Sequence, residues 1–154
     1  MVDAPPRAAD ALAAAVGTAM LARDQAARAL GMTLEAILPG AARVAMVVRD
    51  DMLNGHALCH GGLIFTLADT AFAYACNSHN HSTVAAAAEI QFLSPGRAGE
   101  TLVAVARERI VSGRTGIYDV DVTERASGRL IALFRGRSQQ ITGTVVPDAT
   151  GGAP

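Results

Sequence analysis

Two long stretches of the chain follow helical patterns. From Asp10 to Leu30, apolar residues recur at helical intervals, with Asp10 placed as an N-cap and Gly31 as a C-terminal stop. Residues 61–76 are apolar on every side and form too long a run for a strand. A helix that is apolar all round is a buried helix. The pattern therefore predicts an amphipathic N-terminal helix and a buried central helix at about residues 61–77.

Alternating apolar and polar positions predict strands on both sides of the central helix. One or two strands precede the central helix, at residues 43–49 and, as a candidate short strand, at residues 32–38. Four strands follow it, at residues 84–92, 101–111, 114–124 and 129–142. Short turns separate the last four strands, at Ser94-Pro95-Gly96, Ser112-Gly113 and Ser127-Gly128. Short turns force neighbouring strands to run antiparallel. We therefore expect an α+β fold in which an antiparallel sheet wraps around one long helix.

The length of 154 residues fits one domain with a sizeable core. Pro5 and Pro6 lie near the start of the chain, and Pro147, Gly151, Gly152 and Pro154 lie near its end, outside the patterned segments. We expect a flexible leader over residues 1–9, a single domain over residues 10–142 and a flexible tail over residues 143–154.

Composition and charge narrow the classes of function. A formal net charge of −1 without basic runs argues against a nucleic-acid partner. No stretch reaches the roughly 18 apolar residues of a membrane span, and residues 11–22 lack the flanks of a signal peptide. Two cysteines, Cys59 and Cys76, do not make a disulfide framework. We therefore expect a cytoplasmic protein that binds neither nucleic acid nor membrane.

Asp69 is the one acidic or basic side chain inside the predicted central helix. Burying a carboxylate costs free energy unless something compensates its charge. Asp69 is therefore either a catalytic base or nucleophile, or a carboxylate that accepts structural hydrogen bonds or faces an interface. The residues at the start of the helix favour catalysis.

The central helix begins at His60-Gly61-Gly62. A helix start presents unpaired N–H groups and the positive end of the helix dipole, and glycines let a ligand approach closely. Such a site suits a thioester carbonyl oxygen that gains negative charge, although Gly-Gly also serves a sharp turn. Asp69 lies about 10 Å along the helix from Gly62. We therefore expect a dimer with composite sites between antiparallel central helices.

These segments resemble the phenylacetate-degradation thioesterases of the hotdog superfamily (the PaaI type). The resemblance rests on NGHALCHGGLIFTLADTAFAYACNS (Asn54 to Ser78), followed in order by FLSPGRAGETL, GRTGIYDV and ALFRGRS. It covers roughly residues 30–142. It implies a hotdog fold that dimerises edge to edge and commonly pairs further into tetramers.

The resemblance also implies a catalytic site. Asp69 matches the catalytic carboxylate, and Gly62 matches the backbone donor to the oxyanion. His60 and Asn54 match residues that orient the thioester and water, and Thr70 matches a position that helps to hold the attacking water. Whether the carboxylate attacks the thioester or activates water stays open.

The implied reaction is hydrolysis of phenylacetyl-CoA or its ring-hydroxylated relatives in phenylacetate catabolism. No cofactor is implied, since coenzyme A is part of the substrate. Other aryl- or medium-chain acyl-CoAs are an alternative. The candidate substrate contacts are Gly61 and Phe65, with Phe72 and Tyr74 as further aryl-slot candidates, and Arg97, Arg114 and Arg137 for the coenzyme A phosphates. Core packing explains each of the aromatic residues better than an aryl slot does, and a solvated surface explains each arginine at least as well as phosphate binding.

Four further interpretations are weaker. His56, Cys59 and His60 match no common zinc spacing, so we expect no metal. A Cys59 nucleophile would leave Asp69 unexplained. A hotdog hydratase would need a histidine after Asp69 in the same helix, and none is there. A non-catalytic acyl-CoA-binding module would have no use for Asp69.

Overall fold

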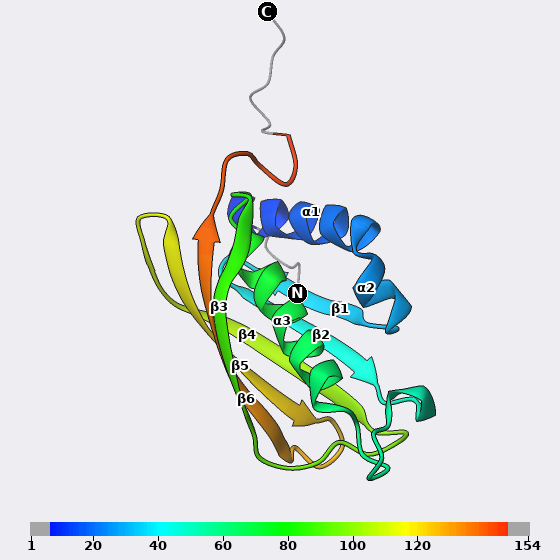
Figure 1. Ribbon diagram of the computed structural model, residues 1–154. Coiled ribbons are helices and arrows are strands. Elements are labelled where there is room, and N and C mark those ends of the chain that lie inside the picture. Colours follow the sequence, from blue (N-terminus) through cyan, green and yellow to red (C-terminus); the bar gives the residue numbers. More distant parts are fainter. Residues whose placement is uncertain (1–6, 148–154) are drawn as a thin grey trace, which may run out of the picture.

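Six antiparallel strands form one sheet in the computed structural model, which describes residues 7–147. Across the sheet their order is β1-β2-β4-β5-β6-β3, so β1 and β3 are the edge strands (Figure 1). Their bounds are Thr33–Leu38 (β1), Ala41–Val47 (β2), Thr83–Phe92 (β3), Thr101–Ser112 (β4), Thr115–Glu124 (β5) and Leu130–Gln140 (β6). The five predicted strands are confirmed, with ends that differ by at most a few residues, and the candidate strand at residues 32–38 is present as β1.

The central helix α3, Gly61–Asn77, lies across one face of this sheet (Figure 1). Leu67, Ala71 and Phe72 are fully buried between the helix and the strands. The predicted helix and the sheet that wraps around it are therefore confirmed. Burial on every side is not complete, however. Within this chain a stripe of α3 stays half-buried or exposed, and it contains Gly62, Thr66, Asp69 and Ala73.

The N-terminal segment forms two helices where one was predicted. Helix α1 spans Ala8–Arg23 and helix α2 spans Gln25–Ala29. The break occurs because Asp24 adopts an extended backbone, and its carboxylate accepts the Ala27 N–H at 2.9 Å as the N-cap of α2. Helix α1 packs on β1 at the edge of the sheet.

Parts of the predicted leader and tail, residues 1–6 and 148–154, lie outside the described residues. Within the described part, α1 begins at Ala8, inside the predicted leader. The Asn80 side chain accepts the backbone N–H groups of Val145 and Val146, beyond the predicted end of the domain. The domain limits therefore stay a prediction, and both ends of the described chain pack beyond them.

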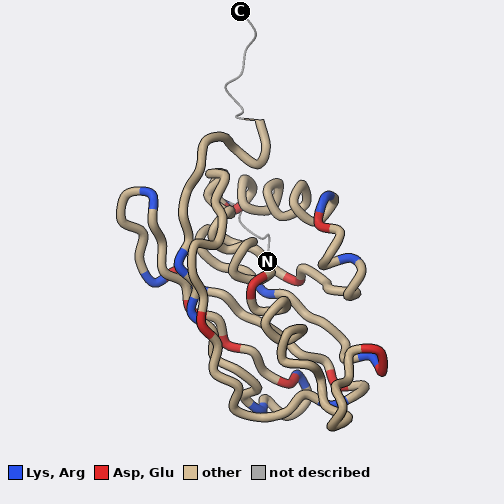
Figure 2. Tube along the Cα trace, viewed as in Figure 1, with Lys and Arg blue, Asp and Glu red and all other residues tan. Residues whose placement is uncertain are grey.

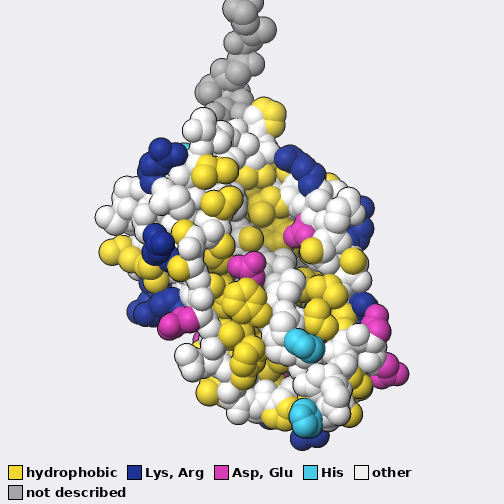
Figure 3. Space-filling view, in the orientation of Figure 1, with side chains coloured by type: hydrophobic (Ala, Val, Ile, Leu, Met, Phe, Trp, Pro, Cys, Tyr) yellow, Lys and Arg dark blue, Asp and Glu magenta, His cyan; other side chains and the backbone are white. Residues whose placement is uncertain are grey.

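The open edge at β3 is apolar. In its ladder β3 pairs with β6, and its other edge has no neighbouring strand in the described part of the chain. Val84 is 46% exposed and Phe92 is 54% exposed, while residues 85–88 are four exposed alanines. Apolar side chains gather over much of the face on which β3 and α3 lie (Figure 3). Open edge strands of this kind are templates for pairing with another chain.

Positive and negative residues are interspersed over the loops and the strands (Figure 2). Several of them pair with each other, such as Arg135 and Arg109 with Asp119. In the described residues, no helix combines the length and the apolar character of a membrane-crossing segment.

Candidate active site

The His60 side chain caps the start of helix α3. Its Nδ1 accepts the Gly62 N–H at 2.9 Å, and its carbonyl oxygen accepts the N–H groups of Leu63 and Ile64. No acceptor within residues 7–147 is in hydrogen-bonding reach of the Gly61 N–H. The cap therefore occupies the donor predicted at Gly62, and the geometry favours the neighbouring Gly61 N–H as the donor to a ligand.

The same cap fixes the tautomer of His60. Because Nδ1 accepts a hydrogen bond, the proton of the neutral ring is on Nε2. The ring is exposed, so this Nε2–H is available as a second donor at the helix start.

Asn54 supplies a third donor from the preceding loop. Its Oδ1 accepts the backbone N–H groups of His56 at 2.9 Å and Leu58 at 3.3 Å, which orients the side-chain amide. The loop itself is fixed because the Cys59 N–H donates to the Gly96 carbonyl at 2.9 Å. Within the described chain the Asn54 amide N–H groups have no acceptor, so they stay available to a ligand.

A pocket of about 330 Å³ lies at this end of α3. It is lined by Asn54, Leu58, Cys59, Gly61, Ile64, Phe92, Leu93, Ser94 and Pro95. Most of these side chains are apolar, and the Asn54 side chain and the Gly61 backbone add polar groups from the loop and the start of α3. This is the composition of a small-molecule site that holds an apolar group and orients one polar group.

Asp69 lies two turns further along the same helix. It is half-buried, and burial raises the pKa of its carboxyl group above the ordinary value. No donor in residues 7–147 reaches this carboxylate, and the neighbouring Thr70 hydroxyl donates to the Thr66 carbonyl at 2.7 Å. An ionisable group that is partly desolvated and has no structural partner is a candidate catalytic group.

The structure does not bring Asp69 to the helix start within one protomer. Eight residues separate it from Gly61, which is about 12 Å along a helix that rises 1.5 Å per residue. Asp69 does lie on the half-covered stripe of α3, where another chain can reach it.

The predicted aryl-slot residues are mostly core residues. Phe72 and Tyr74 are fully buried, so neither can line a ligand slot. Phe65 is half-buried and packs edge-on against Phe134, with ring centroids 5.3 Å apart. The aromatic side chain that lines the pocket is Phe92, which was not among the predicted aryl-slot residues. Its alternation with Ile90 indicates that Phe92 lies on the inward face of β3. No local pattern indicates which part of α3 faces it.

The three candidate arginines do not converge. Arg97 follows Gly96, which is bonded to the loop at the helix start. Arg114 lines a small pocket with Cys76 at the other end of α3, and its Nε donates to the Gln140 carbonyl at 3.1 Å. Arg137 is exposed on β6, opposite Ala87 of the edge strand. Only Arg97 is close to the pocket within one chain.

The cysteine and metal interpretations gain no support from the geometry. Cys59 is buried, and burial raises the pKa of its thiol, which disfavours the nucleophilic thiolate. His56, Cys59 and His60 do not gather, and residues 7–147 contain no group of three side chains placed to hold a metal ion.

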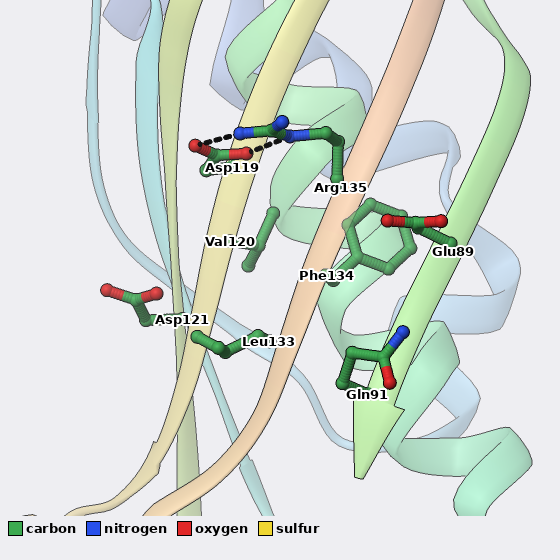
Figure 4. Close-up of a pocket in the computed structure, with 8 residues that line it drawn as sticks. All are labelled: Glu89, Gln91, Asp119, Val120, Asp121, Leu133, Phe134 and Arg135. Atoms are coloured by element: carbon green, nitrogen blue, oxygen red, sulfur yellow. Dashed lines mark hydrogen bonds and ion pairs between the residues drawn. The ribbon is translucent and has the colours of Figure 1, made fainter.

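A second pocket, of about 290 Å³, lies over strands β3, β5 and β6 (Figure 4). Asp119, Leu133 and Arg135 alternate with core residues, so they lie on the sheet face away from α3. The Asp119 carboxylate accepts two hydrogen bonds from Arg135, at 2.6 and 2.9 Å (Figure 4). Asp119 and Arg135 thus neutralise each other, while the Glu89 and Asp121 carboxylates also line this pocket.

The chain is similar to known proteins over most of its length. The sequence pattern of the Thioesterase superfamily matches residues 56–131. The acyl-coenzyme A thioesterase PaaI of Escherichia coli (strain K12) is 48% identical over 131 residues, which are 85% of this chain and 93% of that protein.

Solved structures give the same result. The E. coli PaaI protein from the phenylacetic acid degradation operon superposes with a TM-score of 0.87 at 46% identity, covering 89% of this chain and 99% of that chain. The smu.793 protein of Streptococcus mutans UA159, solved bound to acetyl CoA, has a TM-score of 0.69 at 27% identity and covers 73% of this chain and 90% of that chain. Sequence and fold are thus similar to those of the E. coli protein over most of both chains.

Proposed function

Since this chain belongs to the thioesterase superfamily and has its hotdog fold, we propose that it is an acyl-CoA thioesterase. The substrate is phenylacetyl-CoA or a ring-hydroxylated relative, and the products are the free acid and coenzyme A. The half-buried Asp69 carboxylate, which no donor in residues 7–147 reaches, is the observation that carries the proposal. A relative with 48% identity is named an acyl-coenzyme A thioesterase, and another relative was solved with acetyl CoA bound.

The groups at the start of α3 bind the thioester. The Gly61 N–H donates to the carbonyl oxygen, at the positive end of the helix dipole. The His60 Nε2–H and the Asn54 amide donate to the same oxygen or to the water molecule. These donors stabilise the negative charge that develops on the oxygen during attack, and the apolar part of the pocket holds the acyl group.

Asp69 supplies the reacting carboxylate. It either takes a proton from the attacking water or attacks the thioester carbon itself, in which case water then cleaves the resulting anhydride. In both cases the C–S bond breaks, and coenzyme A leaves as a thiolate that takes up a proton. The chemistry uses protein groups and water, without a cofactor besides the coenzyme A of the substrate.

The active enzyme is a dimer with composite sites. The distance of about 12 Å between Gly61 and Asp69 along one helix means that one carbonyl meets the two groups from different protomers. The open apolar edge at β3 and the half-covered stripe of α3 supply surfaces for this pairing. Pairing of dimers into a tetramer, and a cytoplasmic location, stay predictions.

The Asp69→Asn substitution tests this function. We expect wild type to release free thiol from phenylacetyl-CoA, and the variant to lose at least about a hundredfold in kcat. Asp121→Asn, on the outer face of β5, is the matched control and should keep wild-type rates. Undiminished turnover by Asp69→Asn would contradict carboxylate catalysis. Binding of aryl- and straight-chain acyl-CoAs without any turnover by wild type would instead indicate a non-catalytic binding module.

A further inference from the structure

One aromatic ring of this chain is placed to meet a ligand. The chain has four phenylalanines, two tyrosines and no tryptophan. Five of these six side chains belong to the core or pack against it: Phe65, Phe72, Tyr74, Tyr118 and Phe134. Phe92, the sixth, is 54% exposed.

The backbone of Gly61 sets the position of the Phe92 ring. Phe92 ends β3, pairs with Ala132 of β6 and shares the inward face of β3 with Ile90. Three of its ring atoms lie 3.1, 3.4 and 3.5 Å from the position that a Cβ on residue 61 would occupy. The ring therefore lies against the first turn of α3, and the absence of a side chain at Gly61 makes this contact possible.

This position joins the ring to the groups that bind the thioester. Phe92 lines the same pocket of about 330 Å³ as Asn54 and Gly61, and the rest of the pocket wall contains no aromatic residue. An acyl group whose carbonyl oxygen accepts the Gly61 N–H extends from that point along the pocket. The Phe92 ring is the side chain nearest to a Cβ built on residue 61, so it lies beside the acyl group at this point.

We propose that Phe92 selects aryl-acetyl groups over straight-chain acyl groups of similar size. The inference rests on the proposed function, because it concerns the acyl group of the same site. Pairs of aromatic rings gain stability beyond the burial of their area, by an amount that corresponds to a factor of roughly 2 to 12 in affinity. An alkyl chain buries area against Phe92 but lacks this ring–ring contribution.

Phe92→Leu is the test variant, since leucine keeps an apolar side chain and removes the ring. We expect kcat/KM for phenylacetyl-CoA to fall about five- to tenfold, and kcat/KM for octanoyl-CoA, which has the same number of acyl carbons, to change less than about twofold. Leu133→Ala, an exposed apolar position on the outer face of β6, is the control and should leave the ratio unchanged. An equal fall for both substrates, or an unchanged ratio in Phe92→Leu, would overturn the proposal.

A binding measurement separates this inference from the proposed function. In the Asp69→Asn background, titration calorimetry with the same two CoA esters gives dissociation constants without turnover. We expect the added Phe92→Leu change to weaken phenylacetyl-CoA selectively, again by about five- to tenfold. Absence of hydrolysis by wild type would overturn the thioesterase function. The ratio of the two dissociation constants would still show whether Phe92 selects aryl groups. If the ratio of the two dissociation constants is the same with phenylalanine and with leucine at position 92, Phe92 has no selective role.

Discussion

At the scale of single residues, the burial of Asp69 has a consequence for the pH dependence of the reaction. The carboxylate must be ionised to act as base or nucleophile, and burial raises its pKa. The rate should therefore be full above this raised pKa and fall as the pH drops through it. We expect the acid limb of kcat/KM for phenylacetyl-CoA to lie above the ordinary aspartate pKa of about 3.9. A pH–rate profile of the free-thiol release measures it.

The His60 imidazole also lies at the site, and a substitution can remove it. Asparagine is a favoured N-cap residue, so His60→Asn keeps an acceptor for the Gly62 N–H and removes the imidazole. We expect the acid limb to persist in this variant, at a lower overall rate. If the acid limb of the pH–rate profile disappears in His60→Asn, the limb belongs to the imidazole and not to Asp69. If the limb lies at or below the ordinary aspartate pKa, the predicted effect of Asp69 burial is contradicted.

At the scale of elements, the packing of α3 on the sheet depends on a glycine in β6. A Cβ on Gly136 would lie 2.8 Å from two ring atoms of Phe72. That ring cannot move away freely, because Tyr118 and Phe134 pack on it with centroid distances of 5.4 and 5.9 Å. We expect Gly136→Ala to lower the free energy of unfolding by about 1–3 kcal/mol through overpacking. Urea denaturation measures the change.

A second glycine provides the control for this substitution. No heavy atom lies within 4 Å of a Cβ built on Gly55. Gly55→Ala should therefore leave the free energy of unfolding within about 0.5 kcal/mol of wild type. If Gly136→Ala were as stable as Gly55→Ala, the Phe72 ring would repack at no cost in free energy. This would contradict its close packing against Tyr118 and Phe134.

Helices and strands with a clear periodicity of apolar residues were predictable from the sequence, and contacts between these elements were not. Helix α3 and five of the six strands follow from the spacing of apolar residues, because that spacing reflects which faces are buried. The break at Asp24 was missed because capping by a side chain interrupts a helix without changing the apolar pattern around it.

The same distinction holds for the site. Asp69 and Gly61 lie on one helix and His60 caps its start, so these candidates follow from local signals: an acidic group in an apolar helix and glycines at its beginning. The cap on the Gly62 N–H depends on a side-chain rotamer, and the contact of Phe92 with Gly61 depends on how β3 folds back beside α3. No local pattern encodes either of these two contacts.

At the scale of the whole molecule, composite sites can be tested by mixing two inactive chains. One chain carries Asp69→Asn and the other carries His60→Ala, with different affinity tags for co-expression. Each homodimer should be nearly inactive. A heterodimer has one site with both defects and one intact site, so we expect about half of the wild-type activity. Inactive heterodimers would place the carboxylate and the donors of each site in the same protomer.

The order of the strands also affects how the chain folds during its synthesis. Strand β3 directly follows α3 along the chain, but its ladder partner is β6, the last strand of the sheet. At translation speeds of about 5–20 residues per second, β3 emerges several seconds before β6. During that interval both edges of an alanine-rich, apolar strand are without a partner. A nascent chain that stalls between β5 and β6 should therefore be a strong client for chaperones that hold exposed strands.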